Sequence, residues 1–255
     1  MPAETIVILG TAQAGPTLAV CNYLRERFPG CQFIYERPES RKEFLQRRIR
    51  KLGVLTVAGQ IAFQAIAVPL LKKLSASRIA QIKAEFGMRT APISGHVFSS
   101  LNSQYAIDQI KVLNPACIVV AGTRILSREF LQNLRCPIIN IHAGITPLYR
   151  GVHGAYWAIA EKRSELCGVT IHRVDAGIDT GQVLAQEIVK PTPEDNFVTY
   201  PWIQLGLGLQ LLVKLLPDVI AGRMAMTEPL TSESRLRTHP TIWEYCWRRI
   251  VHGVK

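Results

Sequence analysis

The sequence lacks the cysteine and histidine spacing of a metal site or a disulfide framework. Its six cysteines are scattered, no two form a C-x-x-C pair, and none clusters with histidine. We therefore expect no metal, and thiols that are buried and unpaired. Acidic residues are also scarce, because 19 stand against 30 basic residues and the net charge is +11. Such a charge favours an anionic partner, such as a nucleotide, a phosphorylated substrate, an RNA or a membrane surface, without choosing among them.

The first residues lack the features of an export signal. No basic segment precedes the apolar run at residues 6–9, and that run is too short for the apolar core of a signal peptide. We therefore expect a cytoplasmic protein. A length of 255 residues and a hydrophobic fraction of 48% are typical of a globular protein with one large domain and an appendage, or with two small domains.

The first 35 residues alternate between strand and helix patterns. An apolar run ends at Gly10, helical spacing follows over residues 16–28, and residues 32–35 form a second short strand pattern. This order predicts a parallel α/β sheet. The loop at residues 10–15 has neither the G-x-G-x-x-G pattern nor a P-loop, so we do not expect a nicotinamide cofactor.

Residues 41–83 have an unusual composition. Six basic residues precede an uncharged run from Leu52 to Leu71, and Lys72 and Lys73 follow it. A helix of this length could reach across a hydrocarbon core, but glycines, glutamines and Pro69 interrupt it. We predict a buried helix pair and keep a patch that rests on an anionic membrane as the alternative. A transmembrane span is the least favoured interpretation, because both flanks are equally basic.

The alternation of strands and helices returns from Ala116 onward. The pattern predicts strands at residues 117–121, 137–141, 169–174 and 183–189, and helices at 127–133, 152–163 and 200–216. The last helix is expected to stop before Pro217, since proline cannot donate a backbone hydrogen bond. The segment after Gly222 is short and carries three aromatic residues near its end.

Two polar side chains close the predicted strand that ends near Ile141. Because side chains alternate across a strand, Asn140 and His142 point to one face and Ile141 to the other. Open α/β sheets bind their ligands at the carboxyl ends of the strands. An amide and an imidazole therefore leave the sheet together, and the backbone N–H groups of residues 151–154 are expected to open toward the same cleft.

A second polar feature is the loop Asp175-Ala176-Gly177-Ile178-Asp179-Thr180-Gly181, which lies between two predicted strands. Its glycines and aspartates can bend the backbone tightly and direct a carboxylate inward. A calcium loop is disfavoured, because the twelve-position pattern with its final glutamate is absent.

Taken together, these segments resemble one family. The motifs are Asn140-Ile141-His142 with Pro147 and Gly151, followed by Gly168-Val169-Thr170-Ile171-His172, Asp179-Thr180-Gly181 and Gln186. They are similar to those of the folate-dependent formyltransferases, which include glycinamide ribonucleotide formyltransferase, methionyl-tRNA formyltransferase and the sugar N-formyltransferases. The resemblance is firm over residues 116–190, weak over residues 1–35, and absent over residues 37–90 and the last thirty or so residues.

The resemblance implies a fold and a division of the chain. The expected fold is α/β, a Rossmann-like, mostly parallel twisted sheet with helices on both faces. The catalytic domain would cover residues 1–221, with a basic and apolar insertion at about 37–90. A short C-terminal extension would cover residues 222–255.

The resemblance also implies a set of site residues. Asn140, His142 and Asp179 would form the catalytic triad. The co-substrate N10-formyltetrahydrofolate would contact Thr123, Arg124, Ile125, Leu126, Val174, Asp175, Ala176, Gly177 and Ile178, and the acceptor would contact Pro147, Tyr149, Arg150, Gly151 and His153. The amide and a protonated imidazole can stabilise the oxygen of an attacked formyl group. Asp179 is expected to raise the pKa of His142, whereas His172 and Thr170 fit a buried core as well as a working site.

The acceptor that we expect is the amine of a nucleotide-linked amino sugar, as in enzymes of surface-polysaccharide synthesis. The Gly-Ser-Asn phosphate loop of the glycinamide ribonucleotide enzymes is missing from residues 10–15. The 33 residues after Gly222 are too few for the second β domain of the methionyl-tRNA enzymes, so we expect no nucleic-acid partner. Formyl-folate hydrolysis, the other two acceptors, and a non-catalytic binding or membrane-docking protein of the same fold stay open. So do a homodimer and membrane association through residues 41–83.

Overall fold

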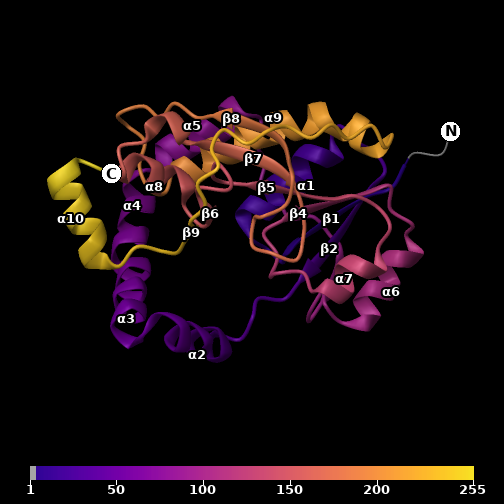
Figure 1. Ribbon diagram of the computed structural model, residues 1–255, viewed down its shortest axis with the longest axis horizontal. Helices are drawn as coiled ribbons and strands as arrows, with labels where there is room; N and C mark the ends of the chain where they lie inside the picture. Colours follow the sequence, from indigo (N-terminus) through magenta and orange to yellow (C-terminus); the bar gives the residue numbers. More distant parts are fainter. Residues whose placement is uncertain (1–3) are drawn as a thin grey trace.

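The computed structural model describes residues 4–255, which surround one seven-stranded sheet (Figure 1). The strand order is β3 (His96–Phe98), β2 (Cys31–Glu36), β1 (Ile6–Thr11), β4 (Cys117–Ala121), β5 (Ile138–His142), β7 (Gly168–Arg173) and β8 (Val183–Ile188). The first five strands are parallel, and β7 runs antiparallel to both of its neighbours. The prediction of a mostly parallel α/β sheet is confirmed.

Helices cover both faces of the sheet. Ile6 and Ile8 of β1 belong to a core formed with α1 (Gly15–Arg25) and α9 (Tyr200–Ile220). Their neighbours Val7 and Leu9 pack on the other face with α6 (Gln104–Val112) and α7 (Arg128–Asn133). Side chains alternate along a strand, so a strand that is buried on both faces must be apolar throughout, as β1 and β4 are.

A third, aromatic core lies beside the sheet and is centred on α8 (Gly154–Ala160). The ring of Phe63 lies 4.8 Å from that of Phe197 and 4.9 Å from that of Tyr245, measured between centroids. Tyr156 of α8 packs 5.2 Å from Phe197 in an edge-on geometry, which is a favourable arrangement for aromatic rings. This core attaches the helical segment at residues 63–79 and the C-terminal helix α10 (Ile242–His252) to the body of the protein.

The segment at residues 41–83 differs from its prediction. Helix α2 (Arg41–Leu52) has no buried residue, and α3 (Val54–Ala62), the π turn η1 (Phe63–Ala67) and α4 (Val68–Leu74) form one continuous helix before α5 (Ala76–Glu85). Only 28% of the most apolar window of that long helix is buried. The expectation of a buried helix pair is therefore wrong: one side of a single helix packs on the body, and the other side is exposed.

Two helices, residues 54–74 and 200–220, are long and apolar enough to cross a membrane by length and composition. The second of these is α9, whose Leu209, Leu212 and Leu216 are completely buried against the sheet. A core helix of a soluble domain meets the same criteria of length and composition, so α9 needs no membrane to account for its apolar character.

The predicted boundaries are close for the strands and less so for two helices. The helix predicted at residues 152–163 spans only 154–160, because His153 (φ 60°) and Lys162 (φ 58°) adopt left-handed backbone conformations beside its ends. Helix α9 continues through Pro217 to Ile220 instead of stopping before the proline. Pro217 lies in the last turn, where it removes a single backbone hydrogen bond, and its carbonyl accepts a bond from the Ala221 N–H at 3.1 Å.

The segment after Gly222 returns to the body of the protein. Its strand β9 (Leu236–Arg237) pairs with β6 (Arg150–Gly151), and β6 directly follows the loop after β5.

Two of the six cysteines differ from the expectation of buried thiols. Cys246 on α10 is exposed, and Cys136, before β5, is half-buried, so the expectation holds only for the other four cysteines.

Truncating the core side of α9 should destabilise the fold. Leu212 is completely buried, and we expect Leu212→Ala to lower the free energy of unfolding by about 2–5 kcal/mol, because a cavity replaces the lost side chain. The matched variant Leu230→Ala, at a position that is 55% exposed, should change it by less than about 0.5 kcal/mol. Urea denaturation followed by circular dichroism measures both, and equal effects would contradict the placement of α9.

Candidate active site

The three predicted catalytic side chains meet at the carboxyl end of β5. Asn140 and His142 are supplied by the strand itself, and Asp179 comes from the loop after β7. The Nδ1 atom of His142 lies 3.4 Å from Oδ2 of Asp179. The amide Nδ2 of Asn140 lies 3.1 Å from Nε2 of His172, which in turn is 3.5 Å from Oδ1 of Asp179. The structure therefore brings together residues that are far apart in the sequence.

A hydrogen bond of His142 shows which of its two ring nitrogens carries the proton. Its Nε2 atom lies 2.7 Å from the backbone carbonyl of Tyr149, and a carbonyl oxygen can only accept, so Nε2 carries a proton. In the neutral ring, Nδ1 then has the lone pair, and it faces the Asp179 carboxylate. His142 is thus arranged to receive a proton at Nδ1, where the carboxylate stabilises the resulting cation.

The backbone around Asp179 fixes the position of its carboxylate. Asp179 has a left-handed conformation (φ 51°), and the Gly151 N–H donates to its Oδ2 at 2.8 Å. Burial alone would raise the pKa of Asp179, but the neighbouring imidazoles of His172 and His142, in their protonated forms, and the Gly151 N–H outweigh it and lower the pKa to about 2. The carboxylate is therefore ionised at neutral pH. The N–H of Gly151 is committed to this bond and that of Gly154 to the Ala143 carbonyl, so they do not open toward a ligand as expected.

The pKa of His142 shifts in the direction opposite to the expectation. Burial lowers it below the ordinary value, although the nearby Asp179 and the Tyr149 carbonyl act to raise it. The side chain is only 6% exposed. Taking a protonated imidazole out of water therefore costs more free energy than its attraction to one carboxylate at 3.4 Å recovers. His142 is accordingly neutral at rest near pH 7, with a lone pair at Nδ1 that is able to accept a proton.

His172 belongs to the site, although the sequence left it equally consistent with a core residue. It is almost fully buried, yet its Nε2 lies between Asn140 and Asp179. The antiparallel pairing of β5 with β7 places His172 directly opposite Asn140. The signal in the sequence was the period of two from Thr170 to His172, but only the register between two distant strands shows which residue His172 faces.

A cavity of about 440 Å³ lies over the triad. Eight of the nine residues that were predicted to contact the folate line it; these are Thr123, Arg124, Ile125, Leu126, Val174, Asp175, Gly177 and Ile178. Ala176 is exposed and does not line it. The contact roles of these residues stay predictions, but the structure assembles them around one space.

An acidic residue that the sequence did not single out anchors the first of these loops. Glu36, at the end of β2, is only 2% exposed and forms an ion pair with Arg124 at 2.8 Å. It also accepts the Arg124 backbone N–H, and a guanidinium nitrogen of Arg124 donates to the Ser99 carbonyl at 2.5 Å. Arg124 is therefore held by protein groups, and we assign it the role of positioning the loop at residues 122–126.

A second cavity, of about 590 Å³, lies on the other side of the same loop. Both cavities share Gly122, Ile141 and Ala143, and the second is mostly apolar, with Phe197 and Trp202 in its wall. Of the residues predicted to contact the acceptor, His153 lines this second cavity and Gly151 lines the first.

The other predicted acceptor contacts lie elsewhere. Pro147 and Arg150 line neither cavity, and a guanidinium nitrogen of Arg150 lies 3.4 Å from the Ile178 carbonyl. Tyr149 is completely buried, with its hydroxyl 3.2 Å from Glu161, so its side chain cannot reach a ligand in either cavity. Its contribution to the site is the backbone carbonyl that orients His142.

Two histidines meet at the edge of the second cavity. Nε2 of His153 lies 2.8 Å from Nδ1 of His239, which is also 3.0 Å from the Gln64 amide. Burial and the neighbouring His239 lower the pKa of His153 to about 3, and burial and Arg48 lower that of His239 to about 4. Both rings are therefore neutral near pH 7, and the cavity wall offers them as hydrogen-bonding groups without charge.

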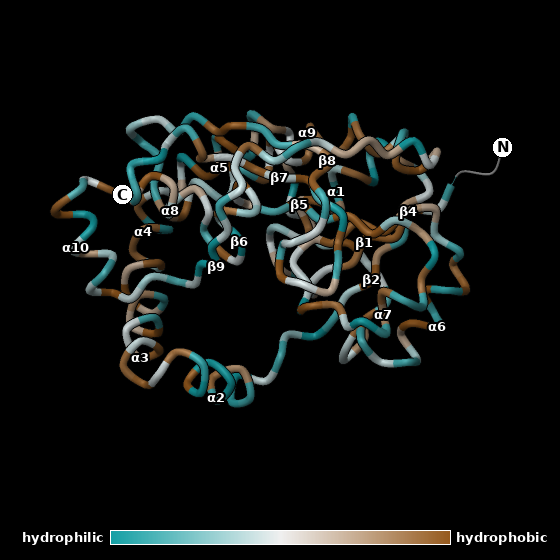
Figure 2. The backbone as a smooth tube through the Cα atoms, in the orientation of Figure 1, coloured by the Kyte–Doolittle hydropathy of each residue, from teal (hydrophilic) through white to brown (hydrophobic). Residues whose placement is uncertain are grey.

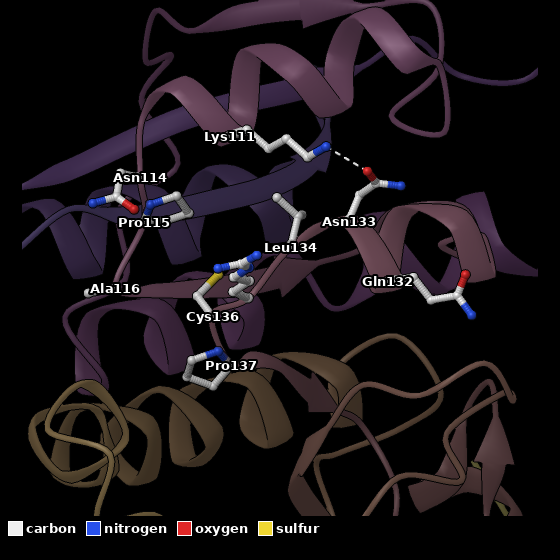
Figure 3. A pocket seen from close by; sticks show the side chains of 10 residues that line it. Lys111, Asn114, Pro115, Ala116, Gln132, Asn133, Leu134, Cys136 and Pro137 are labelled. Carbon is white, nitrogen blue, oxygen red and sulfur yellow. Dashed lines mark hydrogen bonds between the residues drawn. The ribbon is translucent and has the colours of Figure 1, made fainter.

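A larger hollow of about 660 Å³ lies at the opposite end of the sheet, between the amino ends of β4 and β5 (Figure 3). Its polar side chains include Lys111, whose ammonium donates to the side-chain oxygen Oδ1 of Asn133 at 2.5 Å. Ligands of open α/β sheets bind at the carboxyl ends of the strands, and no residue of the triad lines this hollow. We therefore place the chemistry at the other edge.

The fold and the site together define an open α/β protein with a partly buried Asn–His–Asp arrangement at the carboxyl end of its strands. A formyl transferase family model matches residues 59–202, which is more than half of the chain. The chain belongs to the formyl transferase family. The match begins inside the segment at 37–90 that the sequence separates as an insertion, so the family pattern extends into α3.

Individual relatives differ in the molecules that they are named for. A methionyl-tRNA formyltransferase from Kosmotoga olearia is 30% identical over 159 residues, which is 61% of this chain and 49% of that protein. The chain thus spans about half the length of the curated relatives that it matches. The structure of glycinamide ribonucleotide transformylase 1 from Symbiobacterium toebii superposes with a TM-score of 0.57 at 16% identity, over 89% of this chain and 92% of that one.

An N-formyltransferase from Helicobacter canadensis, in complex with folinic acid and dTDP-3-aminofucose, superposes with a TM-score of 0.50 at 15% identity. The match covers 92% of this chain and 70% of that one. At such identities the two solved structures show that the fold is shared, and they do not choose an acceptor.

The low pKa of Asp179 predicts a pH dependence of stability. Because the folded pKa, about 2, lies below the ordinary value near 3.9, ionised Asp179 stabilises the fold by about 2 kcal/mol above pH 5, and this contribution is lost as the pH falls toward 2. In Asp179→Asn the contribution is absent. The difference in free energy of unfolding between the two proteins should therefore narrow by about 1 kcal/mol from pH 5.5 to pH 3. Urea titrations at both pH values measure it, and a constant difference would contradict the buried ion.

Proposed function

We propose that this protein transfers a formyl group from N10-formyltetrahydrofolate to the amine of a nucleotide-linked amino sugar. The observation that carries the proposal is the position of the triad: Asn140, His142 and Asp179 line one cavity, and that cavity shares the wall formed by Gly122, Ile141 and Ala143 with a second one. The two cavities are therefore adjacent, so that an acceptor in the second would lie next to a formyl group held in the first. Transfer between two bound molecules requires such a junction.

The residues of the first cavity suit a reduced folate. Its wall combines apolar side chains, such as Ile125, Leu126 and Val174, with polar backbone of the loop at residues 175–179. A flat heteroaromatic ring system needs this combination of apolar contact and hydrogen-bonding groups. Bound there, the folate supplies the formyl carbon that the amine attacks; the new carbon–nitrogen bond forms first, and the bond to the folate nitrogen breaks when that nitrogen takes up a proton.

The protein contributes hydrogen bonds and proton transfer at named atoms. One amide hydrogen of Asn140 is directed at His172, and the second remains for the formyl oxygen, on which negative charge develops. His142 accepts the proton of the attacking amine at Nδ1 and can return it to the departing folate nitrogen. Asp179, ionised and 3.4 Å away, stabilises the imidazolium between these two steps.

The second cavity supports a nucleotide-linked acceptor. Trp202 and Phe197 offer aromatic surface for a base, and the ammonium of Lys83 lies 4.1 Å from the centre of the Trp202 ring. Lys72 lines the same cavity and is a cation for phosphate. The Helicobacter canadensis structure, with its dTDP-linked amino sugar, supports the same class, whereas the sequence relatives named for methionyl-tRNA support the second candidate.

The decisive experiment is an acceptor panel. The protein is mixed with N10-formyltetrahydrofolate and, separately, with dTDP- and UDP-linked amino sugars, glycinamide ribonucleotide and methionyl-tRNA, and the products are identified by mass spectrometry. Formylation of an amino sugar alone supports the proposal. Formylation of methionyl-tRNA would show that the proposed acceptor is wrong and that formyl transfer is right. Formate without any formylated amine indicates hydrolysis.

Removing the imidazole should separate binding from turnover. We expect His142→Ala to bind the folate within about threefold of the wild-type affinity and to lose at least about a hundredfold in kcat, because the proton acceptor is gone. Equilibrium dialysis and steady-state kinetics measure the two quantities. Equal loss of both would show that His142 is structural.

Trp202 tests the acceptor cavity. Since stacking on an aromatic ring contributes about 1–3 kcal/mol per base, Trp202→Ala should raise the KM for the sugar nucleotide by roughly tenfold, while the KM for the folate stays within about twofold. Tyr105→Ala, at an exposed position on α6, serves as the control and should change neither. An increase in the KM for the folate alone would show that the acceptor does not bind in the second cavity.

A further inference from the structure

The long helix formed by α3, η1 and α4 has an exposed apolar side. Leu55 is 79% exposed and Leu74 is 74% exposed, and Ile61, Ile66 and Leu70 between them are also exposed. The opposite side is attached to the body through Val57, Phe63 and Val68, which are buried. In Figure 2 this helix shows long brown stretches next to the mostly teal α2.

The π turn keeps the exposed side chains on one side of the helix. A π turn contains one more residue than an α turn, so it shifts the register of everything after it. In a regular α-helix with 3.6 residues per turn, Leu70 would lie on the side opposite the exposed Ile61, and Leu74 would lie close to that side. Both side chains would then turn toward the body of the protein. Both are exposed, and the apolar stripe therefore continues along the whole helix.

Helix α10 extends this stripe. Trp243, Trp247, Ile250 and Val251 are all at least half exposed, and their spacing of 4, 7 and 8 residues from Trp243 places them on one side of the helix. The Trp243 ring lies directly over Gly59 of α3, where even a methyl group would come within 2.2 Å of it. Both helices stand at one side of the molecule (Figure 1), and the contact at Trp243 joins their apolar stripes into one surface, which we call the apolar face.

The charge beside the long helix has one sign, and the one acidic residue of α10, Glu244, is paired with Arg248 at 3.3 Å. Between Glu43 and Glu85 the sequence has no acidic residue, but it has Arg47, Arg48, Arg50, Lys51, Lys72, Lys73, Arg78 and Lys83. Arg50 and Lys51, at the end of α2, and Lys73, at the end of α4, are exposed at the two ends of the apolar stripe. A segment with this distribution repels other cations and attracts a surface of negative charge.

We propose that the apolar face docks on the surface of an anionic lipid bilayer, with α3, α4 and α10 lying in the interfacial plane. Apolar helix sides that carry tryptophan and are bordered by arginine and lysine have the composition of interfacial helices. The side chains of Phe63 and Gln60 tie the long helix to the body, the latter through a 2.6 Å bond to the His239 carbonyl, so the helix lies along the membrane and does not cross it.

Charge selects the bilayer over a second copy of this chain. Two copies that met through this face would bring their basic ends together, and each carries a net charge of +11. Anionic headgroups reverse the sign of that interaction and contribute about 1 kcal/mol for each lysine or arginine near the surface.

The test is flotation of the full chain with two kinds of vesicle. One is made of phosphatidylcholine alone, and the other also contains phosphatidylserine at about 30 mol%. We expect binding to the phosphatidylserine vesicles, and at least about tenfold weaker binding both to phosphatidylcholine alone and at high salt. Leu55→Gln/Ile66→Gln/Leu70→Gln should weaken binding by at least about tenfold. The matched control Tyr105→Gln/Val112→Gln/Leu230→Gln removes exposed apolar side chains elsewhere and should bind like the wild type.

A second pair of variants tests the charge. Arg50→Gln/Lys51→Gln should weaken binding by roughly thirtyfold, at about 1 kcal/mol for each charge, while Arg128→Gln/Lys190→Gln, exposed elsewhere, should change it by less than about threefold. Circular dichroism of each variant confirms folding. No flotation of the wild type, equal binding by the two apolar variants, or a dimer that the apolar-face variant alone dissociates would each overturn the proposal. Because flotation does not depend on the acceptor panel, the two proposals can fail separately.

Discussion

The Asp179 carboxylate accepts the Gly151 N–H and lies within 3.5 Å of two imidazoles. These three partners come from β6, from β5 and from β7, so one charge joins three segments of the chain. A buried carboxylate without such partners would be protonated or would destabilise the fold. Its ionisation at neutral pH therefore depends on the neighbours that the site needs in position, and the stability of the loops and the chemistry of the site have the same origin.

A second buried carboxylate has a comparable role at the other wall of the cavity. Glu36 holds the loop at residues 122–126 through the side chain and the backbone of Arg124. Since β2 and β4 flank β1 in the sheet, this ion pair crosses the carboxyl edge over β1. Each of the two loops is thus held by one carboxylate, which lets the cavity between them form before a ligand arrives.

The sequence predicts the site well where a local pattern contains the information. The period of two at Asn140 and His142, and the turn residues around Asp179, each predict a direction for a side chain. What the sequence could not supply is the pairing of β5 with β7, because register between strands 30 residues apart depends on the whole sheet. The role of His172 and the burial of Tyr149 follow from that pairing and from the packing of α8. The direction of the His142 pKa shift also required coordinates, since it is a balance between burial and an ion pair.

The long apolar segment shows the opposite limit. Its composition is compatible with a buried helix, an interfacial helix or a membrane span, and these alternatives differ only in what covers each side. In the structure Gln64, Val68 and Lys72 line the second cavity, while Leu55, Ile66 and Leu70 are exposed. One helix therefore forms the wall of the proposed acceptor site with one side and the apolar face with the other. The π turn at Phe63–Ala67 lies between these two tasks, because it sets the rotation of α4 relative to α3. If the same residues were wound as a regular α-helix, Val68 and Lys72 would turn away from the cavity and Leu70 would turn toward the body, so the positions of both surfaces depend on this one π turn.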